Sequence, residues 1–322
     1  MTTPSPDFSI VLPAYNEAAH VAPLVATLIS IVAKLGSAEI IFVDDGSSDG
    51  TLAALRAAAA NPMVRYVSFT RNFGHQQALR AGLHRARGRA VVVMDADFEH
   101  PPELIPELIA AWRSGAKVVA TQRIDDKIQV SVLKRLTSQL YYRLLNMISD
   151  VRIAPGSADY MLLDRAAVDH INVLEDQDIF LRGLARWFGF PMKTVPFVRG
   201  KRREGTTKYS LRRMVDLAIT GIMAHTVRPL RFAVWLSLAF VGLAMLLVIY
   251  AIISFVFVRH TVAGWSSIMA AIALLGAVQL LVLGIIGEYV GRILRETRKW
   301  PSYIVAETEA GGKDDENRLR HS

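Results

Sequence analysis

The sequence predicts an α/β domain with a mostly parallel sheet, followed by two membrane-spanning helices. Over the first 125 residues, short β-rich runs alternate with stretches of helical periodicity. Such alternation is typical of parallel sheets covered by helices on both faces. Farther along the chain, the uncharged stretches 232–258 and 261–287 are each 27 residues long. Both exceed the roughly 20 apolar residues that a helix needs to cross a bilayer.

The expected strands and helices follow one another in strict order. The strands are rich in β-branched residues and cover residues 8–13, 39–44, 64–69, 90–94 and 118–121. The helices cover residues 17–33, 51–60 and 75–86 and a segment that opens at Pro101-Pro102-Glu103. Proline is tolerated in a first helical turn because its missing N–H would have no partner there. In such a sheet, ligands bind at the carboxyl ends of the strands.

The composition of the 322 residues narrows the class of protein. Cysteine is absent, which excludes a disulfide framework, a zinc site built on thiolates and a thiol nucleophile. The 37 basic and 29 acidic residues give a net charge of +8. This excess favours an anionic partner, which leaves nucleic acid, a phosphate-bearing substrate and an acidic membrane surface open.

Basic residues on both sides of the apolar stretches predict their orientation. Arg228 and Arg231 precede the pair, and four basic residues follow it: Arg292, Arg295, Arg298 and Lys299. By the positive-inside rule, both flanks face the cytoplasm. We therefore expect a multi-pass protein of the inner membrane with both termini in the cytoplasm. Buried core helices of a soluble protein are the alternative explanation.

These patterns divide the chain into four expected regions. Residues 1–208 form a cytoplasmic α/β domain, 209–228 an amphipathic helix on the inner leaflet, 229–291 a transmembrane hairpin and 292–322 a cytoplasmic tail. The tail is polar from about Ala306, so we expect it to be partly disordered. The first seven residues lack a basic region and a long apolar run, so no signal peptide is expected.

Acidic residues stand at the carboxyl ends of two expected strands. Asp44 and Asp45 follow the second strand, and Asp95 and Asp97 follow the fourth. Neither a Gly-x-Gly-x-x-Gly turn nor a Walker motif is present, which disfavours dehydrogenases and Walker-type ATPases. An Asp-x-Asp pair suits Mg²⁺ or Mn²⁺ that bridges to substrate phosphates. A solvated loop is the alternative, but two adjacent carboxylates after a buried strand are costly without a cation nearby.

Four motifs carry a resemblance to a known family. They are Val11-Leu-Pro-Ala-Tyr-Asn-Glu17, Val43-Asp-Asp-Gly-Ser-Ser-Asp-Gly-Thr51, Arg71-Asn-Phe-Gly74 and Met94-Asp-Ala-Asp97. In this order they resemble the family-2 inverting glycosyltransferases, whose GT-A fold is a Rossmann-like nucleotide-sugar-binding domain. Within that family the chain is most similar to the polyisoprenyl-phosphate glycosyltransferases, which include bactoprenol glucosyltransferases and dolichol-phosphate mannose synthases. The resemblance runs from about Phe8 to Tyr209 and continues in the two apolar stretches.

The resemblance implies a donor site for a nucleotide-sugar. It assigns the base and ribose to Pro13, Tyr15, Glu17 and Asp44. It assigns the ribose and pyrophosphate to Asp95, Ala96 and Asp97, with support for the phosphates from Arg123. Mg²⁺ or Mn²⁺ is expected on Asp97 and Glu99, although glutamine is usual where Glu99 stands. His100 replaces a usual aspartate, and we expect it on the surface.

The resemblance also implies an acceptor site. Asp159 would face the anomeric carbon of the sugar, while Asp164 is expected to cap the next helix. The acceptor phosphate is assigned to Arg199, Arg202 and Lys208, which belong to a basic loop at 199–213 that carries +6 of the net charge. The expected catalytic residues are Asp97, Asp159 and Arg202. A solvated basic face or a patch for lipid headgroups is the alternative for the loop.

These residues imply transfer of one hexose from a nucleotide-sugar to polyprenyl phosphate on the cytoplasmic membrane face, with inversion. UDP-glucose is the favoured donor and GDP-mannose the next. Membrane lipids are expected partners, nucleic acid is not, and a homo-oligomer is left open. A nucleic-acid-binding protein would spread its basic residues over an open face. A non-enzymatic membrane interaction protein would be expected to lose the strand-end carboxylates.

A processive polysaccharide synthase is the remaining enzymatic alternative. Such enzymes usually carry a Gln-x-x-Arg-Trp motif and more than two spans. Here Arg182-Gly-Leu-Ala-Arg186-Trp187 has arginine in place of the glutamine. Both differences disfavour this alternative.

Overall fold

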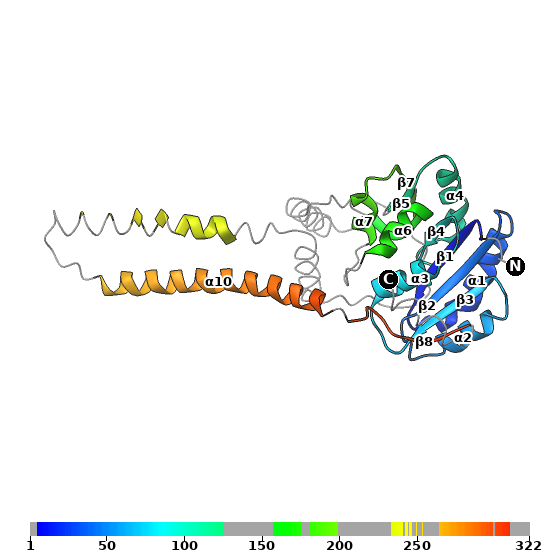
Figure 1. The fold of residues 1–322 in the computed structure, drawn as a ribbon, viewed down its shortest axis with the longest axis horizontal. Coiled ribbons are helices and arrows are strands. Elements are labelled where there is room, and N and C mark those ends of the chain that lie inside the picture. Colours follow the sequence, from blue (N-terminus) through cyan, green and yellow to red (C-terminus); the bar gives the residue numbers. More distant parts are fainter. Residues whose placement is uncertain are drawn as a thin grey trace. The chain divides into compact units, whose positions relative to one another are not determined.

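The computed structural model divides the chain into two compact units, which we describe separately (Figure 1). The catalytic unit comprises Met1–Arg143, Val151–Lys208 and Trp300–Ser322, and the hairpin unit comprises Leu144–Asp150 and Tyr209–Lys299. The structure describes residues 5–124, 157–174, 181–198, 233–240, 242, 243, 245, 246, 249, 253, 264–298 and 300–309.

The catalytic unit is built on one sheet whose described strands run in the order β7-β5-β6-β4-β1-β2-β3-β8. Their bounds are β1 Phe8–Ala14, β2 Ala38–Asp44, β3 Val64–Phe69, β4 Ala90–Val93, β5 Val118–Arg123, β6 Ser157–Asp164, β7 Met192–Phe197 and β8 Val305–Thr308. The pairs β1–β2, β1–β4, β2–β3 and β5–β7 are parallel. Strand β6 is antiparallel to both β4 and β5, and β8 is antiparallel to β3. The sheet is therefore mostly parallel, as the sequence predicts.

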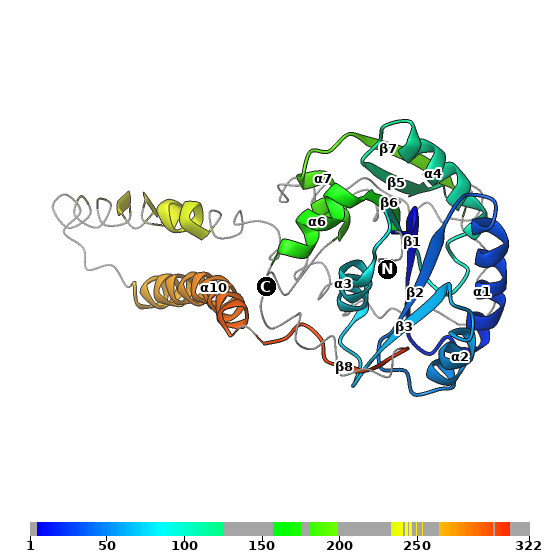
Figure 2. The same cartoon turned by 45° about the vertical axis from the view of Figure 1, so that its right-hand side comes forward.

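Helices cover both faces of the sheet (Figure 2). One face packs against α1 Ala18–Val32, α2 Thr51–Ala58 and α4 Ile105–Arg113, which the 3₁₀ turn Pro102–Leu104 precedes. The other face packs against α3 His75–Arg85, α6 Arg165–Val173 and α7 Leu181–Trp187. Alternate residues of each strand supply the two cores: in β1, Ile10 and Leu12 face the first and Val11 the second.

All of the elements expected up to residue 121 are confirmed, with ends shifted by a few residues at most. The disorder expected from about Ala306 is wrong for the first residues of that segment. Residues 305–308 form β8, because they pair with the backbone of β3, while Arg56 binds Glu307 within the strand and Arg65 binds Glu309 just after it. The polar composition gave no sign of this strand, since its partners lie more than two hundred residues away in the chain.

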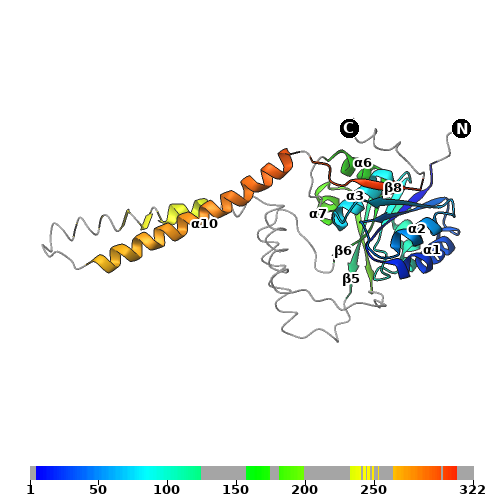
Figure 3. The ribbon, with the colours of Figure 1, turned by 90° about the horizontal axis from the view of Figure 1, so that it is seen from below.

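In the hairpin unit, α10 spans Trp265–Thr297 as one uninterrupted helix (Figure 3). It continues well beyond residue 287, where the sequence places the end of the second apolar stretch. Its segment Leu274–Gly291 is long and apolar enough to cross a membrane, and no other described helix is. Residues 233–240 are helical, but much of the first expected span and all of the expected amphipathic helix lie outside the described residues. The prediction of two spans therefore stays a prediction.

Candidate active site

The carboxyl ends of β1, β2 and β4 meet at one edge of the sheet. The parallel register aligns Ala14 with Asp44 and Val11 with Val93. The loops that follow these three strands therefore begin side by side, as expected for a parallel sheet. They carry most of the residues that the sequence assigns to the donor site.

The first two of these loops are locked together by hydrogen bonds. Asn16 adopts a positive φ of 58°, its N–H donates to Ser47 Oγ at 2.9 Å, and its Oδ1 accepts from the Ser48 N–H at 2.9 Å. The N–H of Glu17 donates to Thr51 Oγ1 at 2.8 Å. Left-handed backbone is favoured by glycine and asparagine. The Asn-Glu and Gly-Ser-Ser-Asp-Gly-Thr motifs therefore form one rigid rim.

The four residues expected to bind the base and ribose all lie at this rim. Pro13 is buried in β1, and the side chain of Tyr15 is 47% exposed, so its ring is accessible. Glu17 Oε2 lies 2.5 Å from His20 Nδ1. Asp44 is buried and accepts hydrogen bonds from the Ser68 hydroxyl at 2.7 Å and the Ser47 N–H at 3.1 Å. Two donors hold this carboxylate in one orientation.

Asp45 anchors the loop that contains Arg71-Asn-Phe-Gly74. Its carboxylate accepts from the N–H of Phe73 at 2.7 Å and from the N–H of Gly74 at 3.0 Å. Burial raises the pKa of Asp45, although these two bonds oppose the shift. Gly46 has a φ of 67°, and a Cβ there would lie 2.3 Å from the carbonyl carbon of Arg71. Only glycine fits between the two loops.

The turn after β4 brings the carboxyl groups of Asp95, Asp97 and Glu99 into one short segment. Burial raises the pKa of Asp97, and the charges of Glu99 and Asp95 raise it further. Asp97 Oδ1 accepts from the N–H of Glu99 at 2.9 Å, while Phe98 adopts a positive φ of 61°. Among the described residues, no three His, Asp or Glu side chains converge as a ligand cluster. The hard oxygens of Asp97 and Glu99 nevertheless suit a divalent cation that completes its shell with substrate phosphates.

The expectation that His100 lies on the surface is wrong. Its side chain is buried, its ring stacks on Tyr160 with centroids 5.0 Å apart, and its Nδ1 accepts from the Asp95 N–H at 2.9 Å. Burial lowers the pKa of His100 to about 4, so the neutral ring accepts this bond at pH 7. The histidine therefore holds the backbone at the start of the acidic turn.

Asp159 lies in β6 and is paired with a residue that the sequence assigned no role in the site. Arg182 of α7 donates to its two carboxylate oxygens at 2.6 and 2.7 Å. His75 is the first residue of α3, and its Nε2 lies 3.6 Å from Asp159 Oδ2 and 3.7 Å from Asp95 Oδ1. Burial opposes ionisation of Asp159, but His75 and Arg182 outweigh it and hold its pKa well below the usual range.

His75 and Arg182 are thus the site residues that sequence reasoning missed. Burial would lower the pKa of His75, but Asp159 and Asp95 raise it overall. The four side chains form a row of alternating charge in the order Asp95, His75, Asp159, Arg182. A usable signal for His75 was its position directly after the Arg-Asn-Phe-Gly motif. Arg182 was considered only as a departure from a synthase motif.

The remaining assignments have different outcomes. Asp164 caps α6, as expected, and accepts from the Ala166 N–H at 3.1 Å. Ala96 is buried in the acidic turn, and Arg123 is the last residue of β5. The three residues assigned to the acceptor phosphate, Arg199, Arg202 and Lys208, lie outside the described residues.

The motifs and the fold agree with matches to two known families. Residues 9–171 match glycosyl transferase family 2, and residues 228–293 match the GtrB C-terminal hairpin. The chain belongs to glycosyl transferase family 2. Its mostly parallel sheet, with acidic residues at the strand ends, is the GT-A-like α/β fold that the sequence predicts.

Several relatives resemble this glycosyltransferase over most of its length. It is 37% identical to the uncharacterized glycosyltransferase YkcC of Bacillus subtilis, over 92% of this chain and 93% of the relative. It is 35% identical to the prophage bactoprenol glucosyl transferase homolog of Escherichia coli, over 92% of this chain and 97% of the relative. It is 36% identical to the bactoprenol glucosyl transferase of Shigella phage SfV, over 92% of this chain and 97% of the relative.

A more distant likeness exists among solved structures. The glucosyl-3-phosphoglycerate synthase of Mycobacterium tuberculosis, in complex with Mn²⁺, UDP and phosphoglyceric acid, aligns with a TM-score of 0.47 and 20% identity. The alignment covers 68% of this chain and 76% of that one.

Proposed function

We propose that this glycosyltransferase transfers one hexose from a nucleotide-sugar to polyprenyl phosphate at the cytoplasmic face of the inner membrane. UDP-glucose is the favoured donor and GDP-mannose the next, and the product is a polyprenyl-monophosphate sugar. The observation that carries the proposal is the gathering of Asp44, Asp95 and Asp97 at one edge of a GT-A-like sheet. The relatives named bactoprenol glucosyl transferase support the lipid acceptor.

In the proposed reaction, a phosphate oxygen of the acceptor attacks the anomeric carbon as the bond to the nucleoside diphosphate breaks. A single displacement of this kind inverts the anomeric configuration. Tyr15 would present a ring face to the base, and Asp44 would accept a base N–H. Asp97 and Glu99 would hold a divalent cation, which neutralises charge on the leaving diphosphate when bound.

The acceptor needs little help from a base. A phosphate monoester has a second pKa near 6 and is mostly dianionic at pH 7. Its approach past several carboxylates instead requires positive charge, and Arg199, Arg202 and Lys208 would supply it through charge-assisted hydrogen bonds. Asp159, which is paired with Arg182, would orient groups near the anomeric carbon rather than remove a proton.

The test is transfer by the purified full chain in lipid nanodiscs. UDP-glucose, GDP-mannose and other nucleotide-sugars are offered with polyprenyl phosphate, and the lipid product is analysed by mass spectrometry and by NMR of its anomeric centre. We expect one sugar per lipid, inverted configuration, and loss of product with Asp97→Asn. A polymeric product would support the processive synthase instead. Failure to transfer any sugar to the lipid would contradict the proposal.

A further inference from the structure

The chain returns to the catalytic unit after α10 and adds a strand to its sheet. We call residues 300–309 the C-terminal strap. Its strand β8 lies along β3 (Figures 1 and 2), with Ser68 opposite Glu307 and Val67 opposite Thr308. The Thr70 N–H also donates to the Ile304 carbonyl at 3.0 Å. Strand β3 is therefore an interior strand rather than an edge with unpaired backbone groups.

Two glutamates clamp the strap onto β3 and α2. Glu307 accepts two hydrogen bonds from Arg56, at 2.8 and 2.6 Å, and a third from the Tyr66 hydroxyl at 3.0 Å. Glu309 accepts from Arg65 Nε at 2.8 Å. Bidentate arginine–carboxylate pairs are both stronger and more specific in geometry than single contacts. The strap is thus held in one register.

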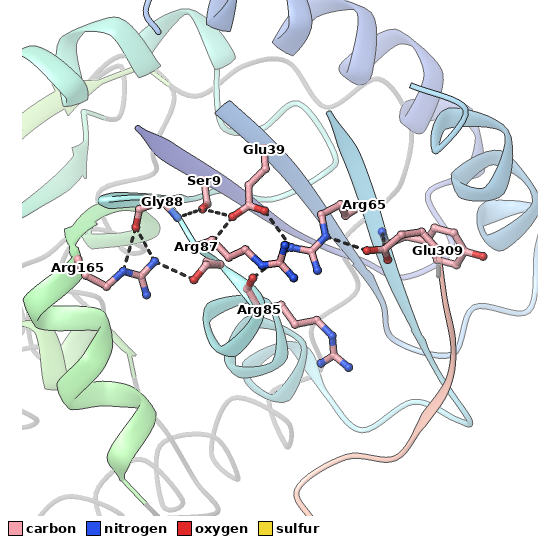
Figure 4. A network of polar contacts seen from close by, with 10 residues as sticks. Ser9, Glu39, Arg65, Arg85, Arg87, Gly88, Arg165 and Glu309 are labelled. Carbon is pink, nitrogen blue, oxygen red and sulfur yellow. Dashed lines mark hydrogen bonds and ion pairs between the residues drawn. The ribbon is translucent and has the colours of Figure 1, made fainter. Parts of the chain in front are cut away.

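The clamp at Glu309 continues into the interior of the unit (Figure 4). Arg65 also donates to Glu39 Oε2 at 2.9 Å, and Glu39 Oε1 accepts from the Ser9 hydroxyl at 2.7 Å. Glu39 and Ser9 are buried near the starts of β2 and β1. Because burial reduces screening by water, the Arg65–Glu39 ion pair contributes more to stability than the ion pair between Glu307 and Arg56, whose side chain is 54% exposed.

The strap also supports the loop that Asp45 anchors. The ring of Tyr303 is buried and stacks on Phe69, with centroids 4.9 Å apart and planes inclined by 16°. Phe69 in turn meets the edge of Phe73 at 5.7 Å, and the Phe73 N–H donates to Asp45. A continuous row of contacts therefore joins Tyr303 to Asp45.

A second and shorter connection leads to Asp44. Glu307 pairs with Ser68 across β8 and β3, and the Ser68 hydroxyl donates to Asp44 Oδ2 at 2.7 Å. Any fraying of β3 at this pair would move the donor that orients Asp44. The strap thus touches the supports of both acidic residues at the end of β2.

We propose that Tyr303, Glu307 and Glu309 are positioning residues for donor binding. They hold β3 in place, so that Ser68 and the 70–74 loop keep Asp44 and Asp45 in position at the proposed nucleotide-binding site. The inference rests on the proposed function, because it takes the donor to be a nucleotide-sugar. Only Arg298 and Lys299 separate α10 from the strap in the chain. The strap therefore also links the apolar helix covalently to the donor side of the site.

The first test uses the full chain in nanodiscs, with UDP affinity from calorimetry and KM values for UDP-glucose and polyprenyl phosphate. Tyr303→Ala removes the stacked ring, and we expect the UDP Kd and the donor KM to rise about 3- to 10-fold. The acceptor KM should stay within about twofold, because none of the residues assigned to the acceptor phosphate belongs to β3 or to the strap. Tyr303→Phe keeps the ring and should bind UDP as the wild type does.

The second test reverses the charges of the outer clamp. Arg56→Glu or Glu307→Arg places like charges side by side, and each should raise the donor KM. The two substitutions together restore opposite charges and should bring it back toward the wild-type value. Asp169→Asn, which removes the exposed ion pair with Arg165 in α6, is the matched control and should leave both KM values unchanged.

The outcomes separate this inference from the proposed function. Unchanged UDP affinity and donor KM in Tyr303→Ala and in both single reversals would overturn the role of the strap. A rise in acceptor KM with an unchanged donor KM would overturn it as well. If Tyr303→Ala fails to fold, the charge-reversal set decides, because the Arg56 side chain is exposed and the Glu307 side chain only half-buried. Failure of the wild type to bind any nucleotide would contradict the proposed function itself.

Discussion

Arg182 binds Asp159 with both ends of its fork, and the two N···O distances are 2.6 and 2.7 Å. The pair joins α7 to β6 beside the acidic turn that follows β4. A carboxylate held in this way has its pKa well below the usual range, despite its burial. Such a group is a poor proton acceptor near pH 7. Asp159 is therefore better suited to orient its neighbours than to act as a general base.

We expect Arg182→Ala to be less stable than the double variant Arg182→Ala/Asp159→Asn. The single change removes the bidentate partner from a buried carboxylate, at a cost of about 3–5 kcal/mol for a broken buried pair. Removing the charge as well recovers part of that loss. Thermal unfolding of the wild type, the two single variants and the double variant measures this coupling. Equal stability of the single and double variants would show that the pair is not coupled.

Arg202 and Asp159, the two catalytic residues expected on the acceptor side, should affect the transfer rate differently. Arg202→Ala should lower kcat/KM by on the order of 10² or more, as removal of a charge-stabilising donor does. Asp159→Asn should cost less, and its deficit should shrink as the pH rises above the second pKa of the phosphate. Steady-state rates from about pH 6 to 8.5 compare the two. An inactive Asp159→Asn beside a nearly normal Arg202→Ala would establish Asp159 as an obligatory base.

Removal of divalent metal should abolish transfer without unfolding the protein. Burial and neighbouring carboxylates raise the pKa of Asp97, so a cation that neutralises this cluster should bind tightly when the pyrophosphate is present. Chelation with EDTA should stop the reaction, and added Mg²⁺ or Mn²⁺ should restore it in the wild type but not in Asp97→Asn. Circular dichroism checks that the fold is retained. Full activity after exhaustive dialysis against EDTA would reject the metal assignment.

Gly46→Ala should destabilise the catalytic unit by roughly 2–4 kcal/mol, from left-handed backbone strain together with overlap in a packed loop. The overlap arises because the new Cβ would lie 2.3 Å from the Arg71 carbonyl carbon. Gly189→Ala is a matched control, because Gly189 has a φ of 69° but open space at its Cβ. Its cost should be limited to the backbone strain. Chemical denaturation of both variants gives the difference, and equal losses would argue against the overlap.

Stability should fall as the pH is lowered from about 6.5 to about 4, in part because of His84. Burial, together with the charges of Arg80 and Arg85, lowers the pKa of His84 to about 4. The unfolded chain therefore binds a proton in this range that the folded chain resists, which costs up to roughly 3 kcal/mol of folding free energy. His84→Gln should flatten this part of the pH profile. Identical profiles for the two proteins would show that His84 does not contribute.

Local residue patterns sufficed to predict much of the catalytic unit. The β-branched runs that became β1 to β5 form strands because alternate side chains can enter the two cores. Asp44 and Asp97 could be assigned to one site because parallel strands end at the same edge of a sheet. Asp164 could be assigned as a cap because the capping bond, to the Ala166 N–H, is made within two residues along the chain.

Other features depend on contacts between distant parts of the chain and appear only in the tertiary structure. Residues 305–308 form a strand because β3 would otherwise be an edge of the sheet. The segment is also held by the pairs Arg56–Glu307 and Arg65–Glu309. His100 is buried because Tyr160 offers a ring on which it stacks. Arg182 reaches Asp159 because α7 packs beside β6. Pairings of this kind depend on which surfaces the packed sheet brings together, and no short-range pattern in the sequence encodes them.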